Sequence, residues 1–228
     1  ITAARMSGML PEHPTDGVWD RIAPATVALT PLWWREDRIE QVEVKALHNG
    51  KELAIHLAWA DPTHDASLVS PQRFSDAAAV QFSADQEPPF FGMGDAEAPV
   101  TLWLWKAAWQ EDVVAWGDVE QQYAGMVVDW YPGQQDYAHG DRFEVSEAKT
   151  ASQDRRLMAG WGADNPLSSP ARTTAAEEAA AKGLGTFTSK PAVDQQVHAT
   201  GLWQDGRWQV VLHRPLAAAD KAGLSLRP

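Results

Sequence analysis

Alternation of apolar and polar residues predicts a pair of β-strands in the first third of the chain. Residues 39–48 and 51–59 alternate in this way, and Asn49 and Gly50 lie between them. Asn-Gly supplies the two positive φ angles of a type I′ turn, so the two segments are predicted to pair as an antiparallel hairpin. Pro62 ends the second strand, because proline has no backbone N–H to donate to a neighbouring strand.

The same pattern predicts a second hairpin near the end of the chain. Residues 197–203 and 207–213 flank Asp205 and Gly206, another dipeptide that favours a tight hairpin turn. Between the two hairpins, residues 100–105 alternate as a further strand. The recurrence of short strands and tight turns favours an antiparallel all-β architecture.

Other segments carry weaker signals. Residues 26–29 and 80–82 are predicted short strands, and Trp33 and Trp34 are expected to cover an edge of the core. Residues 106–170 scatter tryptophan and tyrosine among glycine, aspartate, glutamine and proline, which predicts a long insertion with little regular structure. Insertions of this kind are usually functional or lie against a partner.

One helix is predicted, over residues 174–182. Thr174 and Glu177 have the spacing of a capping box, alanines fill the middle, and Gly183 follows as the residue that ends the helix. These elements predict a mainly β protein. We expect a single antiparallel β-sandwich domain over residues 1–228, similar to a carbohydrate-binding module, with one short helix and one long irregular insertion.

Composition excludes several classes of partner and site. The formal net charge is −12, which argues against nucleic acid or an anionic membrane surface and fits solubility or a basic partner protein. No apolar run reaches the roughly 18 residues of a transmembrane helix, so no membrane span is predicted. Cysteine is absent, which excludes disulfides, thiolate metal sites, iron–sulfur clusters and covalently attached c-type haem from this chain.

The sequence contains no catalytic constellation. The seven histidines lack the spacing of a zinc site, and there is no nucleophile elbow, Walker loop or dinucleotide-binding fingerprint. His56 lies in the middle of a predicted strand and is interpreted as a packed or hydrogen-bonded residue. The twelve tryptophans allow one non-redox function, a carbohydrate-binding β-sandwich in which exposed indole rings stack on sugars.

A candidate metal ligand lies in residues 88–109. This segment begins as a loop rich in proline and glycine, and Met93 lies between Gly92 and Gly94. Glycine lets the backbone approach another body closely, and the thioether of methionine can bind haem iron. From spacing alone, a buried methionine that fills a gap in the loop is the commoner explanation.

The stretch Phe-Phe-Gly-Met-Gly, followed by Ala-Pro-Val-Thr-Leu-Trp-Leu-Trp-Lys-Ala, resembles the haem b (gamma) subunits of type II enzymes of the dimethyl sulfoxide reductase family. These enzymes include ethylbenzene dehydrogenase, dimethyl sulfide dehydrogenase, chlorate reductase and selenate reductase. The resemblance extends over about residues 40–215 and includes the final Gly-x-Trp-x-Asp-Gly-x-Trp hairpin. A methionine in this loop is one axial ligand of a non-covalent haem in that family, which implies the same role for Met93.

The resemblance also implies a second axial ligand. The family places a lysine shortly before the last two strands, and Lys190 has the matching position, with His198 and His139 as the next candidates. A lone lysine before a proline is otherwise a solvated loop residue. Lysine binds iron only as the neutral amine, so burial and the charge of the metal must keep it deprotonated. From their place in the sequence, four aromatic residues are candidates for the apolar wall around the haem: Phe90, Phe91, Trp103 and Trp105.

A haem whose axial positions are both filled by protein carries electrons and does not activate substrate. The resemblance therefore implies a non-catalytic electron-transfer subunit of a periplasmic oxidoreductase complex. Its expected partners are an iron–sulfur beta subunit, a catalytic alpha subunit with a molybdopterin cofactor, and a soluble cytochrome c or similar carrier. The sequence starts at Ile1, for which removal of a secretory leader is the expected explanation.

Overall fold

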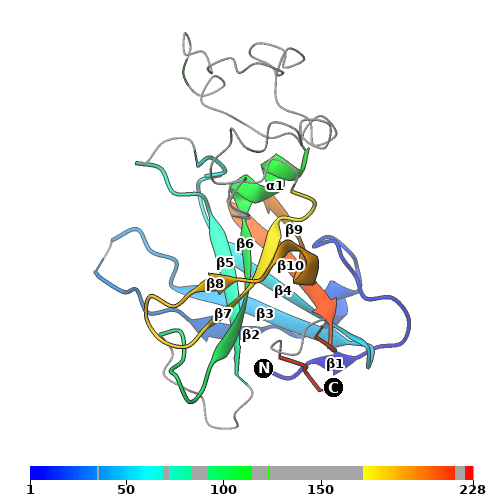
Figure 1. Cartoon of the computed structure of the whole chain (residues 1–228). Coiled ribbons are helices and arrows are strands. Elements are labelled where there is room, and N and C mark those ends of the chain that lie inside the picture. Colours follow the sequence, from blue (N-terminus) through cyan, green and yellow to red (C-terminus); the bar gives the residue numbers. More distant parts are fainter. Residues whose placement is uncertain are drawn as a thin grey trace, which may run out of the picture.

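Two β-sheets pack face to face in the part of the chain that the structure describes (Figure 1). The computed structural model describes residues 1–34, 36–68, 72–83, 92–114, 123, 172–218 and 224–227. Sheet A contains β1 (Ala4–Arg5), β2 (Ala25–Ala28), β3 (Gln41–His48), β4 (Glu52–Ala60), β9 (His198–Gln204) and β10 (Arg207–Pro215). Sheet B contains β5 (Ala77–Ser83), β6 (Val100–Lys106), β7 (Ala176–Ala181) and β8 (Thr188–Ser189). The predicted mainly β sandwich is thereby confirmed.

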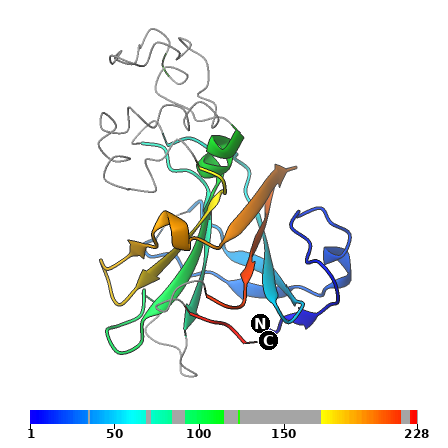
Figure 2. The same ribbon diagram turned by 45° about the vertical axis from the view of Figure 1, so that its right-hand side comes forward.

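The strand order places the two predicted hairpins at the centre of sheet A. Its order is β1-β3-β4-β10-β9, with β2 also paired with β3, and sheet B has the order β5-β6-β7-β8. The described pairs are antiparallel except for the short parallel contact between β1 and β3. Figure 2 shows the two sheets at an angle to each other, with the red C-terminal segment crossing their lower end.

The two hairpins reach the same pairing through different turns. Asp205 and Gly206 have φ angles of 52° and 71°, so the β9–β10 turn has the two predicted left-handed residues. In the β3–β4 turn only Gly50 has a positive φ, which makes the predicted type I′ turn wrong there. The Asn49 side chain bridges the gap instead, because its Oδ1 accepts hydrogen bonds from the backbone N–H groups of Lys51 and Glu52 at 2.9 and 2.8 Å.

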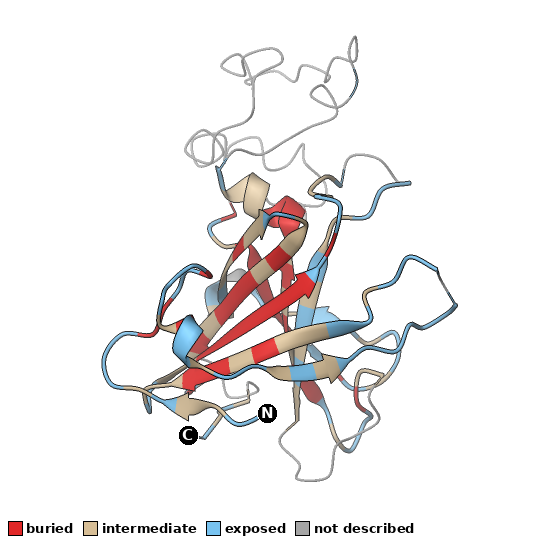
Figure 3. Ribbon diagram, turned by 180° about the vertical axis from the view of Figure 1, so that it is seen from behind, coloured by how far each residue is buried: buried red, intermediate tan, exposed pale blue. Residues whose placement is uncertain are grey.

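The core between the sheets is built around tryptophans. Trp103 and Trp105 of sheet B and Trp208 of sheet A are almost fully buried, and the rings of Trp105 and Trp208 are 4.8 Å apart. Any Cβ at Gly201 would collide with the Trp105 ring, so the glycine of the final hairpin motif lets the two sheets approach. Figure 3 shows the buried residues, in red, concentrated along the central strands.

A second, smaller cluster covers the outer face of sheet A. The N-terminal segment carries the short 3-10 helix η1 (Trp19–Arg21), and Trp19 packs on that face with its ring 5.1 Å from the ring of His56. His56 is therefore a packed residue, as predicted. Trp33 and Trp34 do not cover the core, because 69% and 75% of their surfaces are exposed.

The predicted helix over residues 174–182 is wrong, since this segment forms β7. Alanine and glutamate favour helices, but intrinsic propensity is a weak influence that tertiary pairing overrides. The small side chains of β7 pair with the bulky β6, where Ala176 and Glu178 lie opposite Trp105 and Trp103. Thr174 caps no helix, because its Oγ1 accepts hydrogen bonds from the backbone N–H groups of Ala176 and Ala199.

The helix that does form is α1 (Ala107–Val114), directly after β6. It lies at the start of the segment that was predicted to be irregular, and Trp109 anchors it by burial. The remainder of that segment, apart from Tyr123, lies outside the described residues. Among the residues that the structure describes, no helix is both long and apolar enough to span a bilayer.

Candidate functional site

Met93 occupies a strained position in the loop that leads into β6. Its φ is 79°, in the left-handed region that residues with side chains rarely adopt, and Gly94 follows with a φ of 69°. A Cβ at Gly94 would lie 2.6 Å from the carbonyl oxygen of Ala98, so the loop needs glycine there. Strain of this kind persists where the surrounding structure imposes it, and such positions cluster at functional sites.

Hydrogen bonds fix the Met93 loop against the end of β7. The backbone N–H of Gly183 donates to the carbonyl oxygen of Met93 at 2.9 Å. On the other side, Oδ1 of Asp95 accepts hydrogen bonds from the backbone N–H groups of Glu97 and Ala98 at 3.0 and 2.8 Å. The half-buried Met93 is thus held beside the turn that joins β7 to β8.

Lys190, just after β8, is buried, although a lysine before a proline is usually solvated. Only 7% of it is exposed. Its backbone N–H donates to the carbonyl oxygen of Glu178 at 3.0 Å, and its Nζ donates to Oε1 of the same residue at 2.9 Å. Trp103 is the partner of Glu178 on β6, and Lys190 lies opposite Glu178 on the other side of β7. Residues directly opposite one another point to the same face, so the Lys190 side chain lies on the face of sheet B that packs on sheet A.

The two predicted ligands are therefore anchored along one stretch of the chain, Lys190 to β7 and Met93 to the turn that follows β7. Met93 is bonded at Gly183 and Lys190 at Glu178, two points separated by roughly 16 Å of extended chain. Methionine and lysine both have long, unbranched side chains that can extend several ångströms from their backbones.

A second buried cation contacts the same carboxylate. Nη1 of Arg214, on β10, donates to Oε1 of Glu178, and both side chains are fully buried. The other guanidinium nitrogens donate to the carbonyl oxygens of Pro215 and Leu224, at 3.0 and 2.6 Å. Arg214 therefore connects the two sheets and the C-terminal segment at one point.

Two buried polar atoms beside this cluster lack partners among the described residues. They are Nε1 of Trp103 and Oε2 of Glu178, and the two residues are directly paired across β6 and β7. Phe82 packs on Trp103 with its ring 4.6 Å away. Unpartnered buried polar atoms are rare and call for an explanation, such as a bound group that the chain alone does not contain. A buried amine, the aromatic rings of Trp103 and Phe82, and these orphaned atoms fit the surroundings of a haem.

The other predicted site residues fall elsewhere. Phe90, Phe91 and His139 lie outside the described residues. Trp105 is enclosed by Trp59 and Trp208 and belongs to the core.

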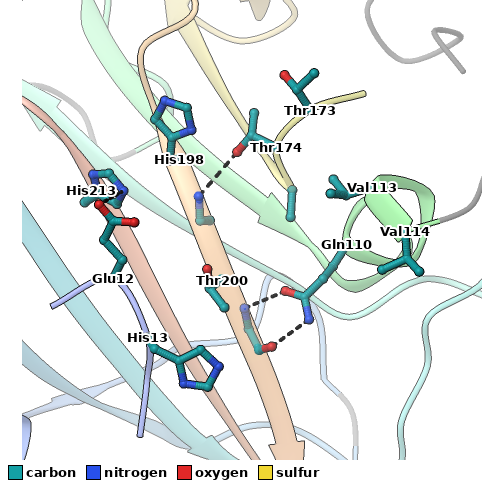
Figure 4. Close-up of a pocket in the computed structure, with 13 residues that line it drawn as sticks. Glu12, His13, Gln110, Val113, Val114, Thr173, Thr174, His198, Thr200 and His213 are labelled. Carbon is teal, nitrogen blue, oxygen red and sulfur yellow. Dashed lines mark hydrogen bonds and ion pairs between the residues drawn. The ribbon is translucent and has the colours of Figure 1, made fainter. Parts of the chain in front are cut away.

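His198 lies in a separate groove of about 570 Å³ at the edge of sheet A (Figure 4). Its ring stacks on that of His213, with centroids 5.3 Å apart, and Nε2 of His213 is 3.6 Å from Oε1 of Glu12. His213 alternates with the buried Leu212 and Arg214, so its side chain lies on the face of sheet A that is turned away from sheet B. Burial lowers the pKa of His213.

On the far side of this groove, Gln110 of α1 covers the edge of β9. The Gln110 side chain donates from Nε2 to the carbonyl oxygen of Gly201 at 2.6 Å and accepts the Gly201 N–H on Oε1, as a neighbouring strand would (Figure 4). Among the described residues, no three histidine, cysteine, aspartate or glutamate side chains are arranged to hold a metal ion. The groove therefore offers an edge cap and a histidine pair, and its described residues lack the three or more ligands of a metal ion held by protein alone.

The outer face of sheet B carries a second buried glutamate next in sequence to Glu178. Glu177 is 2% exposed, and neither of its oxygens has a hydrogen-bond partner within the described part of the chain. Burial raises the pKa of Glu177, and the charges of Arg172 and Lys106 oppose this effect. Sequence analysis missed both glutamates as site candidates because it assigned their segment to a helix, where neighbouring residues do not separate onto opposite faces.

Comparison with known proteins gives two kinds of match. A protein family described as Ethylbenzene dehydrogenase matches residues 16–228. The putative respiratory nitrate reductase heme subunit ORF7 of Haloferax mediterranei is 33% identical over 155 residues, which are 64% of this chain and 49% of that protein. The dimethylsulfide dehydrogenase subunit gamma of Rhodovulum sulfidophilum is 33% identical over 106 residues, 42% of this chain and 40% of that subunit. The chain spans half or less of the length of these curated relatives.

Proposed function

This chain belongs to the ethylbenzene dehydrogenase family, and we propose that it serves as the electron-transfer haem b subunit of a molybdenum oxidoreductase complex. The observation that carries the proposal is the anchoring of the buried Lys190 amine on β7 and of the strained Met93 loop on the turn that follows this strand. The printed names of the two relatives, a heme subunit and a gamma subunit of a dehydrogenase, support it.

In this proposal the Met93 thioether and the Lys190 amine would hold the haem iron. A haem with both axial positions filled supplies one-electron transfer and leaves no position for a substrate. Trp103, which is paired with Glu178, and Phe82, which packs on Trp103, are proposed to exclude water from the site. Phe91, two residues before Met93 in the sequence, is proposed to extend this apolar wall.

The chain then depends on other subunits for chemistry. Having no cysteine, it cannot ligate an iron–sulfur cluster with thiolates of its own. We place it beside an iron–sulfur beta subunit that joins a catalytic alpha subunit with a molybdopterin cofactor, in the periplasm. A soluble cytochrome c is the proposed external carrier, and the basic surface of such a carrier would complement the net charge of −12.

The absorption spectrum of the purified complex tests this function. Protein isolated from haem-replete cells is expected to show an intense Soret band, and a sharper visible band after reduction by dithionite. Mass spectrometry of the co-purifying chains should identify a cysteine-rich subunit and a large catalytic subunit. A colourless complex from such cells would contradict the proposal.

The carbohydrate-binding alternative has less support from the structure. Among the described tryptophans, only Trp33 and Trp34 are exposed over more than half of their surface, and they lie in the loop between β2 and β3. The others are wholly or partly buried, and six of them are in the cores: Trp19, Trp59, Trp103, Trp105, Trp109 and Trp208. A flat stacking platform on either sheet face is therefore not available within the described residues.

A further inference from the structure

A carboxylate fixed from the opposite sheet lies against the proposed amine ligand. Oε1 of Glu178 accepts hydrogen bonds from Nζ of Lys190, at 2.9 Å, and from Nη1 of Arg214. Resting on the proposed haem function, we infer that Glu178, clamped by Arg214, positions Lys190 and sets its strength as an iron ligand. Glu178 is thus a positioning residue, since it acts on iron only through the lysine.

The hydrogen-bonding capacity of an amine allows both contacts at once. A neutral lysine that donates its lone pair to a metal retains two N–H groups, and one of them can still donate to Glu178. A carboxylate that accepts a hydrogen bond from a metal ligand fixes the orientation of that ligand and makes it a stronger donor. The contact at 2.9 Å gives Glu178 this relation to Lys190 before any metal is bound.

Arg214 fixes the position of the Glu178 carboxylate. Its guanidinium donates to three acceptors on three segments: Glu178 of β7, Pro215 of β10 and Leu224 near the C-terminus. It also lies 5.3 Å from the centroid of the Trp103 ring. Because arginine stays protonated in proteins, Glu178 keeps a cationic partner when Lys190 is neutral. Without that partner, an ionised and buried Glu178 would carry a large desolvation penalty.

Glu177 provides a matched control on the same strand. It is as buried as Glu178, with 2% and 0% exposed respectively. Its side chain projects to the opposite face of sheet B, where Arg172 and Lys106 are its charged neighbours. A change at Glu177 removes a buried carboxylate from β7 without touching Lys190.

The experiment compares Glu178→Gln with Glu177→Gln in the whole complex. The amide at position 178 preserves shape but accepts a weaker hydrogen bond, so we expect a weaker amine–iron bond. The near-infrared band of the ferric haem, whose position reports the axial ligands, should move. Haem should be retained about tenfold less tightly when it is titrated out with apomyoglobin, the low end of the effect of losing such a partner. Glu177→Gln should leave both readouts at their wild-type values.

Two results overturn the inference: an unchanged band and unchanged haem retention in Glu178→Gln, or equal changes in both variants. If Glu178→Gln does not fold, Arg214→Lys gives the decision, because it keeps the charge but loses the three-way clamp. The same changes, smaller in size, are expected from it, and their absence overturns the inference. Two other results would refute the proposed haem site itself: a wild-type complex without haem, or a Lys190→Ala variant with the wild-type ferric spectrum. These results differ from those that overturn only the role of Glu178.

Discussion

Sheet A and sheet B differ in what they bury. The inner face of sheet A is apolar along β4 and β10, with Trp59, Val210 and Leu212 in the core and Arg214 as the charged exception. Sheet B buries two glutamates on one strand, one on each face. Burying charge costs free energy unless partners compensate it, and apolar burial is favourable. The difference agrees with the proposal that the functional groups lie on sheet B, beside a core that both sheets build.

The largest expected effect on stability comes from the residue that joins the two sheets. Arg214→Ala should lower the free energy of unfolding by about 3–5 kcal/mol, the usual cost of breaking a buried ion pair. Arg207, on the same strand, pairs with Glu43 at the surface, and Arg207→Ala should cost no more than about 1 kcal/mol. Urea denaturation of the two variants measures both values. Equal losses would mean that the connection between the sheets has no special energetic role.

A core truncation in sheet A should destabilise the fold while sparing the site. Leu212 is fully buried, and Leu212→Ala should cost about 2–5 kcal/mol through lost burial and the cavity left behind. The absorption spectrum of the variant that folds should match the wild type. A shifted spectrum at full occupancy would show that the framework and the site are not separate.

Acid is expected to lower the stability of the fold by a smaller amount, through His56 on sheet A. Burial, with help from the charge of Lys45, lowers the pKa of His56 to about 4 from an ordinary value near 6.5. The unfolded chain takes up a proton between pH 6.5 and 4 that the folded chain excludes, so stability falls as pH falls through this window. The full loss is about 3 kcal/mol and is complete below pH 4.

The matching variant is His56→Gln, which cannot take up this proton. Its stability should depend less steeply on pH between 4 and 6.5, as measured by denaturation at a series of pH values. The stability of the variant should still depend on pH to some extent, because burial lowers the pKa of His213 as well. Parallel curves for the variant and the wild type would rule out His56 as a source of acid sensitivity.

The sequence predicted sheet A better than sheet B for a physical reason. Each hairpin of sheet A is specified by alternation and a local turn, so residues close in sequence decide the pairing. The strand β7 has a composition that favours a helix, and its true state depends on β6, about seventy residues earlier. The family expected from the Met93 loop and the final hairpin is confirmed by the match over residues 16–228.

The candidate site was predictable only where the chain marks it locally. Two flanking glycines singled out Met93, and its left-handed backbone agrees with that constraint. Only the family resemblance implied that Lys190 is buried; the residues around it did not, because its partners Glu178 and Arg214 come from two other strands on two sheets. The exposure of Trp33 and Trp34 was also not predictable, since alternation does not distinguish a covering residue from an exposed one.

The spin state of the ferric haem in Met93→Ala and Lys190→Ala tests the central claim most directly. If both residues ligate one iron, each variant loses an axial ligand, and its electron paramagnetic resonance spectrum should change from low spin to high spin at matched haem content. Replacing His198 by alanine should leave the low-spin signal intact, because His198 lies in the groove at the edge of sheet A, which neither Met93 nor Lys190 lines. A low-spin spectrum that survives both substitutions unchanged would contradict the assignment.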